Sequence, residues 1–264
     1  MGTRYIKMIN IDLGRKIYGI GMFYLGCLSV IAQDFILGRP PAINTDPALA
    51  FLLSISLLVA SGLIILNNKR AGIAALCIGL LILIFSFLVR VVPTLTTFDG
   101  ALWSINAYKA LALVGGSFII AVSFFEDGTS EMPNFLKKFI STKYLKIIGI
   151  ALLALFLIIS GCSHFKYFDF VQNFIPSYIP FHKFFANFTG LCLIGGGVGL
   201  LIPYTRSWSA LLASIMIFSW FLLLHIPRLF DHFYDPSDRM GLGESFVFAG
   251  IFLVLYHLEK NQNN

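Results

Sequence analysis

Eight long apolar stretches, separated by short polar segments, dominate this chain. We place them at residues 15–33, 48–66, 71–92, 103–125, 144–163, 183–203, 208–227 and 241–258. A helix rises about 1.5 Å per residue, so about 20 apolar residues cross a hydrocarbon core about 30 Å thick. Prolines such as Pro93 and Pro227 fall near the ends of these stretches, where they disturb a helix least. The pattern predicts an all-α integral membrane protein with eight transmembrane helices.

The composition agrees with a protein whose surface faces lipid. Hydrophobic residues make up 58% of the chain and charged residues 12%, whereas soluble domains carry about 25% charged residues. The lipid bilayer is therefore the first partner that we predict. The net charge of +6 does not indicate nucleic-acid binding, because the basic residues lie in short connections between apolar spans.

The distribution of Lys and Arg predicts the orientation of the spans. With the N-terminus inside, the inner connections carry more basic residues than the outer ones, as in Lys69-Arg70 and Lys137-Lys138. The positive-inside rule then places both termini in the cytoplasm. We predict a multi-pass protein of the plasma (inner) membrane. Its longest inner connection, 126–143, is the predicted linker between a first domain, 1–125, and a second domain, 144–264.

The two predicted domains look like copies of one unit. Shifting the sequence by 135 positions places Gly26-Cys27 on Gly161-Cys162 and Asp34-Phe35 on Asp169-Phe170. Each copy has four spans, an even number, so both copies insert with the same orientation. The predicted fold is two tandem parallel four-helix up-down bundles, related by a pseudo-twofold axis along the membrane normal.

Histidines gather on the predicted outer side, where His164, His182, His225 and His232 all lie. Polar groups at membrane depth are costly and often mark functional sites. Three interpretations are open: interfacial residues that cap helices and meet headgroups, a ligand pocket at the outer mouth, or a metal site. A metal site would use these histidines with Asp169 or Asp231 as oxygen ligands. No compact ligand spacing such as HxxxH or HExxH appears, so we predict no metal ligands.

Three charged residues inside predicted spans are further candidates for the site. Lys109 lies within the fourth span, and Glu244 occupies the comparable early part of the eighth. Lys109 either extends outward to the membrane surface or pairs with a carboxylate, for which Glu244 and Asp34 are the candidates. Arg90 lies near the outer end of the third span, close to the repeat counterpart of His225.

The second half resembles the DoxX-like family of membrane proteins over roughly residues 145–257. The resemblance rests on GCSHFKYF at 161–168, IPSYIP at 175–180, Thr189-Gly190 and the tripeptide 225–227. The first half is a weaker copy, because Gly26-Cys27-Leu28-Ser29 lacks the histidine.

Members of that family are mostly four-helix membrane proteins, and some resemble the small subunit of a thiosulfate:quinone oxidoreductase. The resemblance thus implies a redox-associated membrane subunit with a quinone site near the outer face. Histidines at 164 and 225 would bind carbonyl oxygens or relay protons, and arginines at 90 and 228 would stabilise negative charge. The candidate ligand-binding residues are His164, Phe165, His182, His225, Arg228, Arg90, Lys109, Glu244 and Asp169, with Pro176, Pro180 and Gly190 as further family-matching positions.

No flavin, haem or iron–sulfur signature is present, so a soluble or membrane redox partner would supply the electrons. Whether the chain is itself an enzyme stays open. Two other functions compete with the redox subunit: a small-solute transporter, for which parallel repeats are suitable, and a non-catalytic assembly or scaffold protein. Against a transporter, the sequence predicts continuous spans without breaks at mid-membrane.

Overall fold

The computed structural model describes residues 2–37, 46–91 and 105–262, and every regular element within them is helical. Seven helical segments are long and apolar enough to cross a membrane: Pro47–Ile65, Ala71–Leu88, Ala107–Glu126, Thr142–Lys166, His182–Leu201, Pro203–Asp231 and Pro236–Lys260. The prediction of an all-α multi-pass membrane protein is confirmed at this level. The predicted first span lies in the helix Gly2–Ile31, which is not among these seven. Arg15 and Lys16 interrupt the apolar part of that helix.

The helices follow one another as α1 Gly2–Ile31, α2 Pro47–Ile65, α3 Ala71–Leu81, η1 Ile82–Val91, α5 Ile105–Glu126, α6 Asn134–Lys137, α7 Thr142–Lys166, α8 Phe168–Phe174, α9 His182–Leu201, α10 Pro203–Trp220, η3 Phe221–His225, α11 Ile226–Asp231 and α12 Pro236–Gln262. Local chemistry fixes some of these ends. Asp46 caps α2 by accepting hydrogen bonds from the N–H groups of Ala48 and Leu49, with Pro47 in the first turn.

Two of the predicted spans are not regular α-helices. The segments η1 and η3 are π-helical, and each ends two residues before a proline, Pro93 or Pro227. Pro227 has no N–H to donate to the carbonyl of Leu223 four residues earlier. The hydroxyl of Tyr178 donates to that carbonyl instead. Both segments nevertheless continue as single helices, Ala71–Leu88 and Pro203–Asp231, so the predicted continuity of these spans holds. Pro93 itself lies outside the described residues.

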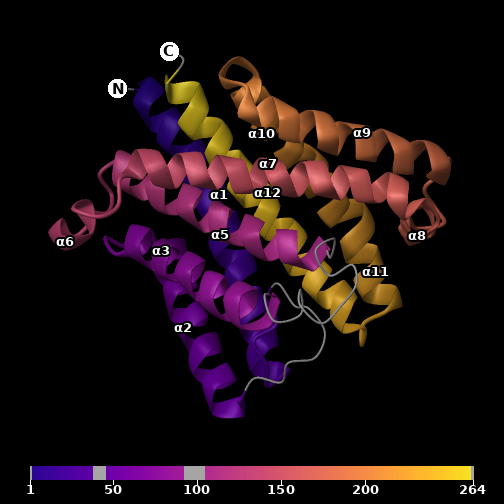
Figure 1. Ribbon diagram of the computed structural model, residues 1–264, viewed down its shortest axis with the longest axis horizontal. Helices are drawn as coiled ribbons and strands as arrows, with labels where there is room; N and C mark the ends of the chain where they lie inside the picture. Colours follow the sequence, from indigo (N-terminus) through magenta and orange to yellow (C-terminus); the bar gives the residue numbers. More distant parts are fainter. Residues whose placement is uncertain (1, 38–45, 92–104, 263–264) are drawn as a thin grey trace.

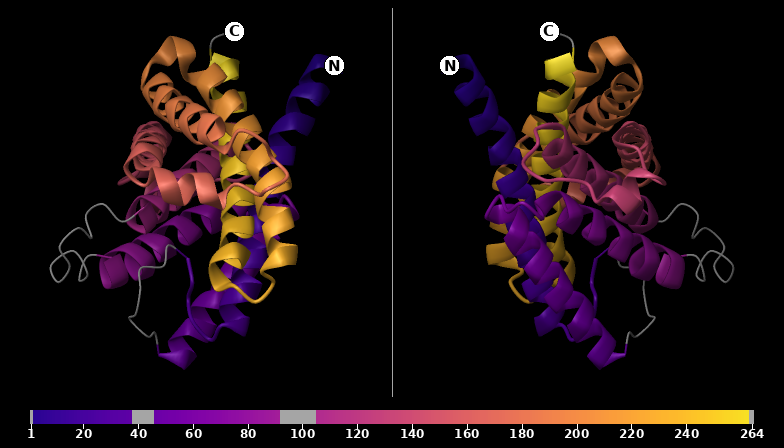
Figure 2. Two further views of the ribbon diagram at one scale, coloured as in Figure 1. Left: turned by 90° about the vertical axis from the view of Figure 1, so that its right-hand side faces the viewer. Right: turned by 90° about the vertical axis from the view of Figure 1, so that its left-hand side faces the viewer.

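Figure 1 shows the two ends of the molecule. The termini and α6 lie toward one end, and α8 and α11 lie toward the other. The side views agree, with the start of α1 and the end of α12 at the same end (Figure 2). Helices of the two predicted halves pack against each other, α1 along α12 and α7 along α5. These contacts do not confirm two separate bundles.

Glycines allow the closest approaches between the halves. A Cβ atom on Gly115 would lie 2.9 Å from the carbonyl oxygen of Gly149, and one on Gly250 would lie 2.7 Å from that of Gly14. Any larger side chain would push the helices apart, as in other membrane helix pairs built on small residues. Gly14 and Gly115 are separated from Gly149 and Gly250, respectively, by the offset that aligns the two halves.

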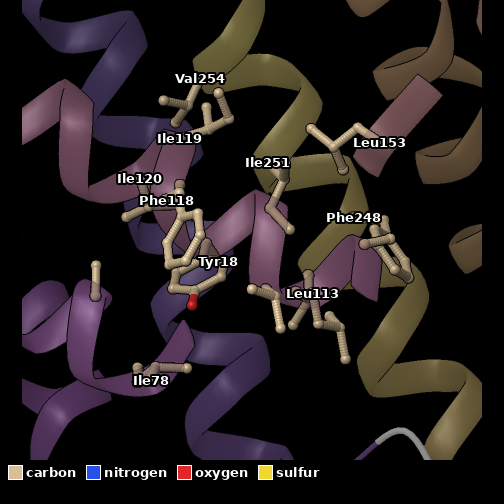
Figure 3. Close-up of a cluster of buried hydrophobic side chains, with 14 of the residues drawn as sticks. Tyr18, Ile78, Leu113, Phe118, Ile119, Ile120, Leu153, Phe248, Ile251 and Val254 are labelled. Atoms are coloured by element: carbon tan, nitrogen blue, oxygen red, sulfur yellow. The ribbon is translucent and has the colours of Figure 1, made fainter. Parts of the chain in front are cut away.

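The apolar core also draws on both halves. Figure 3 shows Tyr18 of α1, Ile78 of α3, Leu113 of α5, Leu153 of α7 and Ile251 of α12 in one buried cluster. The hydroxyl groups of Tyr18 and Ser117 are 2.7 Å apart, so the polar atom of this buried ring has a partner.

Charged side chains that are buried near the termini are paired. Arg15 is 2% exposed, forms ion pairs with Asp12 and Asp127, and lies over the ring of Phe124 at 4.0 Å. In the second half, Glu259 pairs with both Lys146 at 2.6 Å and Arg206 at 3.1 Å. Such pairing offsets the cost of removing these charges from water. We therefore assign both clusters a structural role, in stabilising the end of the molecule that carries the termini.

Candidate functional site

A cavity of about 450 Å³ lies between α5, α7, α12 and η3, toward the end that carries α8 and α11. Its walls are largely aromatic and aliphatic, with a few polar side chains among them. The lining residues are Lys109, Phe156, Ser160, Ser163, His164, Tyr167, Phe170, Val171, Leu193, Ile217, Trp220, His225, Gly241, Glu244, Ser245 and Phe248. An apolar enclosure with few convergent polar groups is typical of small-molecule sites.

His164 reaches the cavity from the end of α7. Its Nδ1 lies 2.8 Å from the carbonyl oxygen of Ser160, one helical turn earlier. Because a carbonyl oxygen can only accept, Nδ1 carries the proton, and Nε2 of the neutral ring is an acceptor. The ring also stacks on Trp220, with ring centroids 6.3 Å apart. Backbone and aromatic contacts therefore fix the ring in one orientation.

His225 reaches the cavity from η3. Its Nδ1 is buried and has no hydrogen-bond partner among the described residues. A Cβ atom on Gly241 would lie 2.9 Å from this nitrogen, so α12 approaches the imidazole closely only because residue 241 is glycine. The rings of Phe174 and His225 also meet edge to face, with centroids 6.3 Å apart. The Nδ1 of His225 is thus a buried polar atom without a described partner in an apolar setting, where an unmade hydrogen bond is costly.

The π-helical geometry of η3 explains why Trp220 and His225 line the same cavity. In an α-helix, residues five apart point about 140° away from each other, at about 100° per residue. In a π-helix the repeat lengthens to i→i+5, so residues five apart share one face. Trp220 immediately precedes η3 and His225 ends it.

Lys109 and Glu244 form an ion pair in the cavity wall. The Nζ of Lys109 on α5 lies 2.7 Å from Oε2 of Glu244 on α12. Glu244 is 4% exposed, and an unpaired carboxylate at that depth would be strongly unfavourable. Of the two alternatives that the sequence left open for Lys109, the structure shows the ion pair, and Glu244 is the partner.

Arg228 lies beside the cavity rather than in its lining. Its guanidinium group binds both carboxylate oxygens of Asp238, at 2.9 and 3.1 Å, and stacks over the ring of Phe174 at 3.7 Å. It also reaches the carbonyl oxygen of Phe174. These contacts join α11, α12 and α8. Arg228 is therefore already neutralised, and its structural role is to hold these three elements together beside the cavity.

The remaining predicted site residues are not brought to the cavity. Phe165 is 42% exposed and packs near Gly190. His182 donates from Nε2 to the carbonyl oxygen of Pro176, and Asp169 accepts a hydrogen bond from the amide of Gln172. The side chain of Arg90 is outside the part of the chain that the structure describes. Within that part, no cluster of three or more metal-ligating side chains occurs.

Several lining residues were not predicted. Ser160 is 8% exposed, and its hydroxyl is buried without a described partner. Its position four residues before His164 places both on one helix face, a signal that the sequence does contain. Trp220, Phe156 and Phe248 carry no such signal, because apolar aromatic residues occur on every face of a membrane helix.

Comparison with known proteins gives one match. A family model described as a domain of unknown function (DUF8561) matches residues 153–247. No curated protein and no solved structure matches the chain. The matched segment runs from α7 into α12 and contains His164, His225 and Glu244, but not Lys109.

Proposed function

We propose that this protein binds a lipid-soluble, quinone-like molecule in the aromatic cavity, as the membrane subunit of a redox system. The proposal rests on one observation, the convergence of polar side chains from separate helices on a single cavity. His164, His225 and the Lys109–Glu244 pair come from four different elements and line one cavity of about 450 Å³. That volume lies within the range of about 300–1,000 Å³ that is usual for small-molecule sites.

The two histidines match the needs of a quinone head group. A neutral His164 accepts at Nε2 from a quinol hydroxyl, and a protonated one donates to a quinone carbonyl. His225 lines the same cavity, and its buried Nδ1 has no hydrogen-bond partner among the described residues. Between them, rings such as Trp220 and the stacked pair Phe156 and Phe248 supply flat apolar surfaces.

Reduction of a quinone to a quinol takes two electrons and two protons. The histidines are suited to the proton part, and a separate redox protein would supply the electrons. The resemblance to the DoxX-like family is part of the same proposal. His164 and His225 belong to the family motif and also line the cavity, whereas Phe165 belongs to the motif but does not line the cavity.

We also infer that α1 is an eighth span and that the halves are parallel repeats. Equivalent glycine contacts, Gly14 with Gly250 and Gly115 with Gly149, support a pseudo-twofold relation. Such an axis would place the first helix of each half against the last helix of the other half, as α1 lies against α12 and α7 against α5. The larger number of Lys and Arg residues in the inner connections supports an orientation with both termini in the cytoplasm. We propose the plasma (inner) membrane as the location.

Quenching of tryptophan fluorescence tests the binding proposal. We expect a short-chain ubiquinone analogue to quench the purified protein in detergent with saturation, because Trp220 lines the cavity. Trp220→Phe should remove most of the saturable quenching, and Trp208→Phe, which changes an exposed residue, should not. Quenching that never saturates, or that is lost equally in both variants, would contradict binding at this site.

A cavity-filling variant tests the same site without changing Trp220, the residue whose fluorescence reports binding. Ser160→Leu places apolar bulk where a buried hydroxyl lines the cavity, and we expect it to abolish saturable quenching. Cys162→Leu adds a leucine to the same helix at an exposed position that does not line the cavity. It should leave the apparent Kd within about twofold. Equal affinity in both variants would rule this cavity out.

A small-solute transporter is a second candidate, favoured by the two π-helical segments. Short π-helical segments inside α-helices often lie at functional sites, and η3 contributes His225 to the cavity. Time-dependent uptake of a labelled solute into proteoliposomes, absent from Ser160→Leu, would favour this function over the redox subunit.

A further inference from the structure

The connection between α5 and α7 presents lysine and phenylalanine side chains together at the surface. Phe135 is 63% exposed and Phe139 is 84% exposed. Lys137, Lys138 and Lys143 are exposed beside them, and none of the ion pairs among the described residues includes these lysines. Large exposed rings next to unpaired cations indicate a surface that meets something both apolar and anionic.

The position of this connection places it at the level of a membrane surface. It joins two candidate membrane spans, Ala107–Glu126 and Thr142–Lys166, and so begins and ends where spans end. Figure 1 shows α6 at the end of the molecule that carries the termini, out to the side of the packed helices. Phenylalanine rings at that depth reach the boundary between headgroups and acyl chains, and lysine side chains reach the phosphates.

A second cavity, of about 440 Å³, lies under this surface. Lys137, Ser141 and Thr142 line it together with the backbone of Gly128, and Glu131 contributes one carboxylate. The side chain of Ser141 makes no capping hydrogen bond to α7, so its hydroxyl is available to a ligand. With Lys138 and Lys143 nearby in sequence, residues 131–143 carry three lysines against one carboxylate, which suits a phosphate group.

We propose that this connection binds an anionic phospholipid of the surrounding bilayer. The headgroup phosphate would lie in the second cavity against Lys137, Ser141 and Thr142. The acyl chains would lie along the exposed rings of Phe135 and Phe139. An acidic protein could also neutralise the lysines, but it would not explain two exposed phenylalanines at membrane level. Lipid satisfies both features with one ligand.

Lipid binding to the full-length protein in neutral detergent tests the proposal by native mass spectrometry. Phosphatidylglycerol and phosphatidylcholine with identical acyl chains are the two probes. We expect phosphatidylglycerol to bind more tightly. In Lys137→Gln/Lys138→Gln its affinity should fall about 25-fold, at about fivefold for each lysine near an anionic headgroup. Phosphatidylcholine binding should change by less than about twofold.

Lys183→Gln is the matched control, because Lys183 is an exposed lysine on α9 at the opposite end. It should leave phosphatidylglycerol affinity unchanged. An unaltered unfolding temperature in the double variant would show that the fold is intact. Equal affinity for the two lipids, or an equal loss in the control, would overturn the proposal. Displacement of phosphatidylglycerol by equimolar glycerol phosphate would also overturn it, by reassigning the cavity to a soluble ligand.

Discussion

Lys109 and Glu244 contact each other across 2.7 Å, although 135 positions separate them in the sequence. That separation equals the offset that aligns the two halves. Residues that a twofold axis exchanges can touch only close to the axis, so the ion pair marks where the proposed axis passes. Gly116 and Ile251, which have the same separation, also face each other. The last helices of the two halves, α5 and α12, would therefore cross on the axis.

Removing one partner of this pair should destabilise the protein strongly. Lys109→Met leaves the buried carboxylate of Glu244 unpaired, at a cost of about 3 kcal/mol. Lys109→Glu/Glu244→Lys should recover most of that loss, because exchanging equivalent positions restores the same pair. Chemical unfolding in detergent measures both variants. A swapped variant as unstable as Lys109→Met would show that the two positions are not equivalent.

The glycine contacts predict a matched pair of destabilised variants. Gly115→Leu and Gly250→Leu each place a side chain against a facing helix backbone, and overpacking of this kind costs about 1–3 kcal/mol. Gly195→Leu is the control, since nothing lies within 4 Å of a Cβ atom at Gly195. It should change the free energy of unfolding by less than about 0.5 kcal/mol. Similar losses at all three positions would indicate a general intolerance of leucine instead.

Much of the fold could be predicted because lipid imposes a simple rule on sequence. Seven of the eight predicted apolar stretches correspond to candidate membrane spans. The partners of those helices could not be predicted, because apolar residues face both lipid and protein. What decides the packing is local shape, such as the absence of side chains at Gly14 and Gly250.

The candidate site was predictable in its charged residues and not in its geometry. Lys109, Glu244, His164 and His225 are conspicuous because polar groups are rare in apolar spans, and all four line the cavity. The family motif also suggested Phe165, which faces elsewhere. The contribution of Trp220 depends on η3, where the hydroxyl of Tyr178, from a distant loop, donates to the carbonyl of Leu223. No local pattern encodes that partner.

Gly241 should be essential for the orientation of His225, if the proposed binding function holds. Gly241→Ala places a methyl group 2.9 Å from Nδ1 and Cε1 of the imidazole, so the ring must rotate. We expect quinone affinity to fall at least tenfold, while Gly195→Ala leaves it unchanged. The same fluorescence titration measures both variants. Unchanged affinity in Gly241→Ala would show that His225 does not contact the ligand.

Asp235 should make the start of α12 sensitive to acid. Hydrogen bonds from the N–H groups of Ser237 and Asp238 hold the pKa of this carboxyl below its ordinary value. Its contribution to stability is therefore present above the ordinary pKa and is lost as pH falls through the lowered value. The unfolding-temperature difference between wild type and Asp235→Ala should shrink between pH 7 and about pH 3. A constant difference would contradict this role.

Arg228→Lys should loosen the cavity wall formed by α8, α11 and α12, although the charge is kept. Lysine can neither bind both oxygens of Asp238 nor stack over Phe174 as the planar guanidinium does. Since these contacts join α11, α12 and α8, we expect faster amide hydrogen exchange in 168–174 and 226–238. Exchange in α3, which has no contact with this wall, should be unchanged and serves as the internal control. If 168–174 and 226–238 also stay protected in Arg228→Lys, the charge pair with Asp238 is enough to hold this wall. Asp238→Asn should then speed up exchange in both segments.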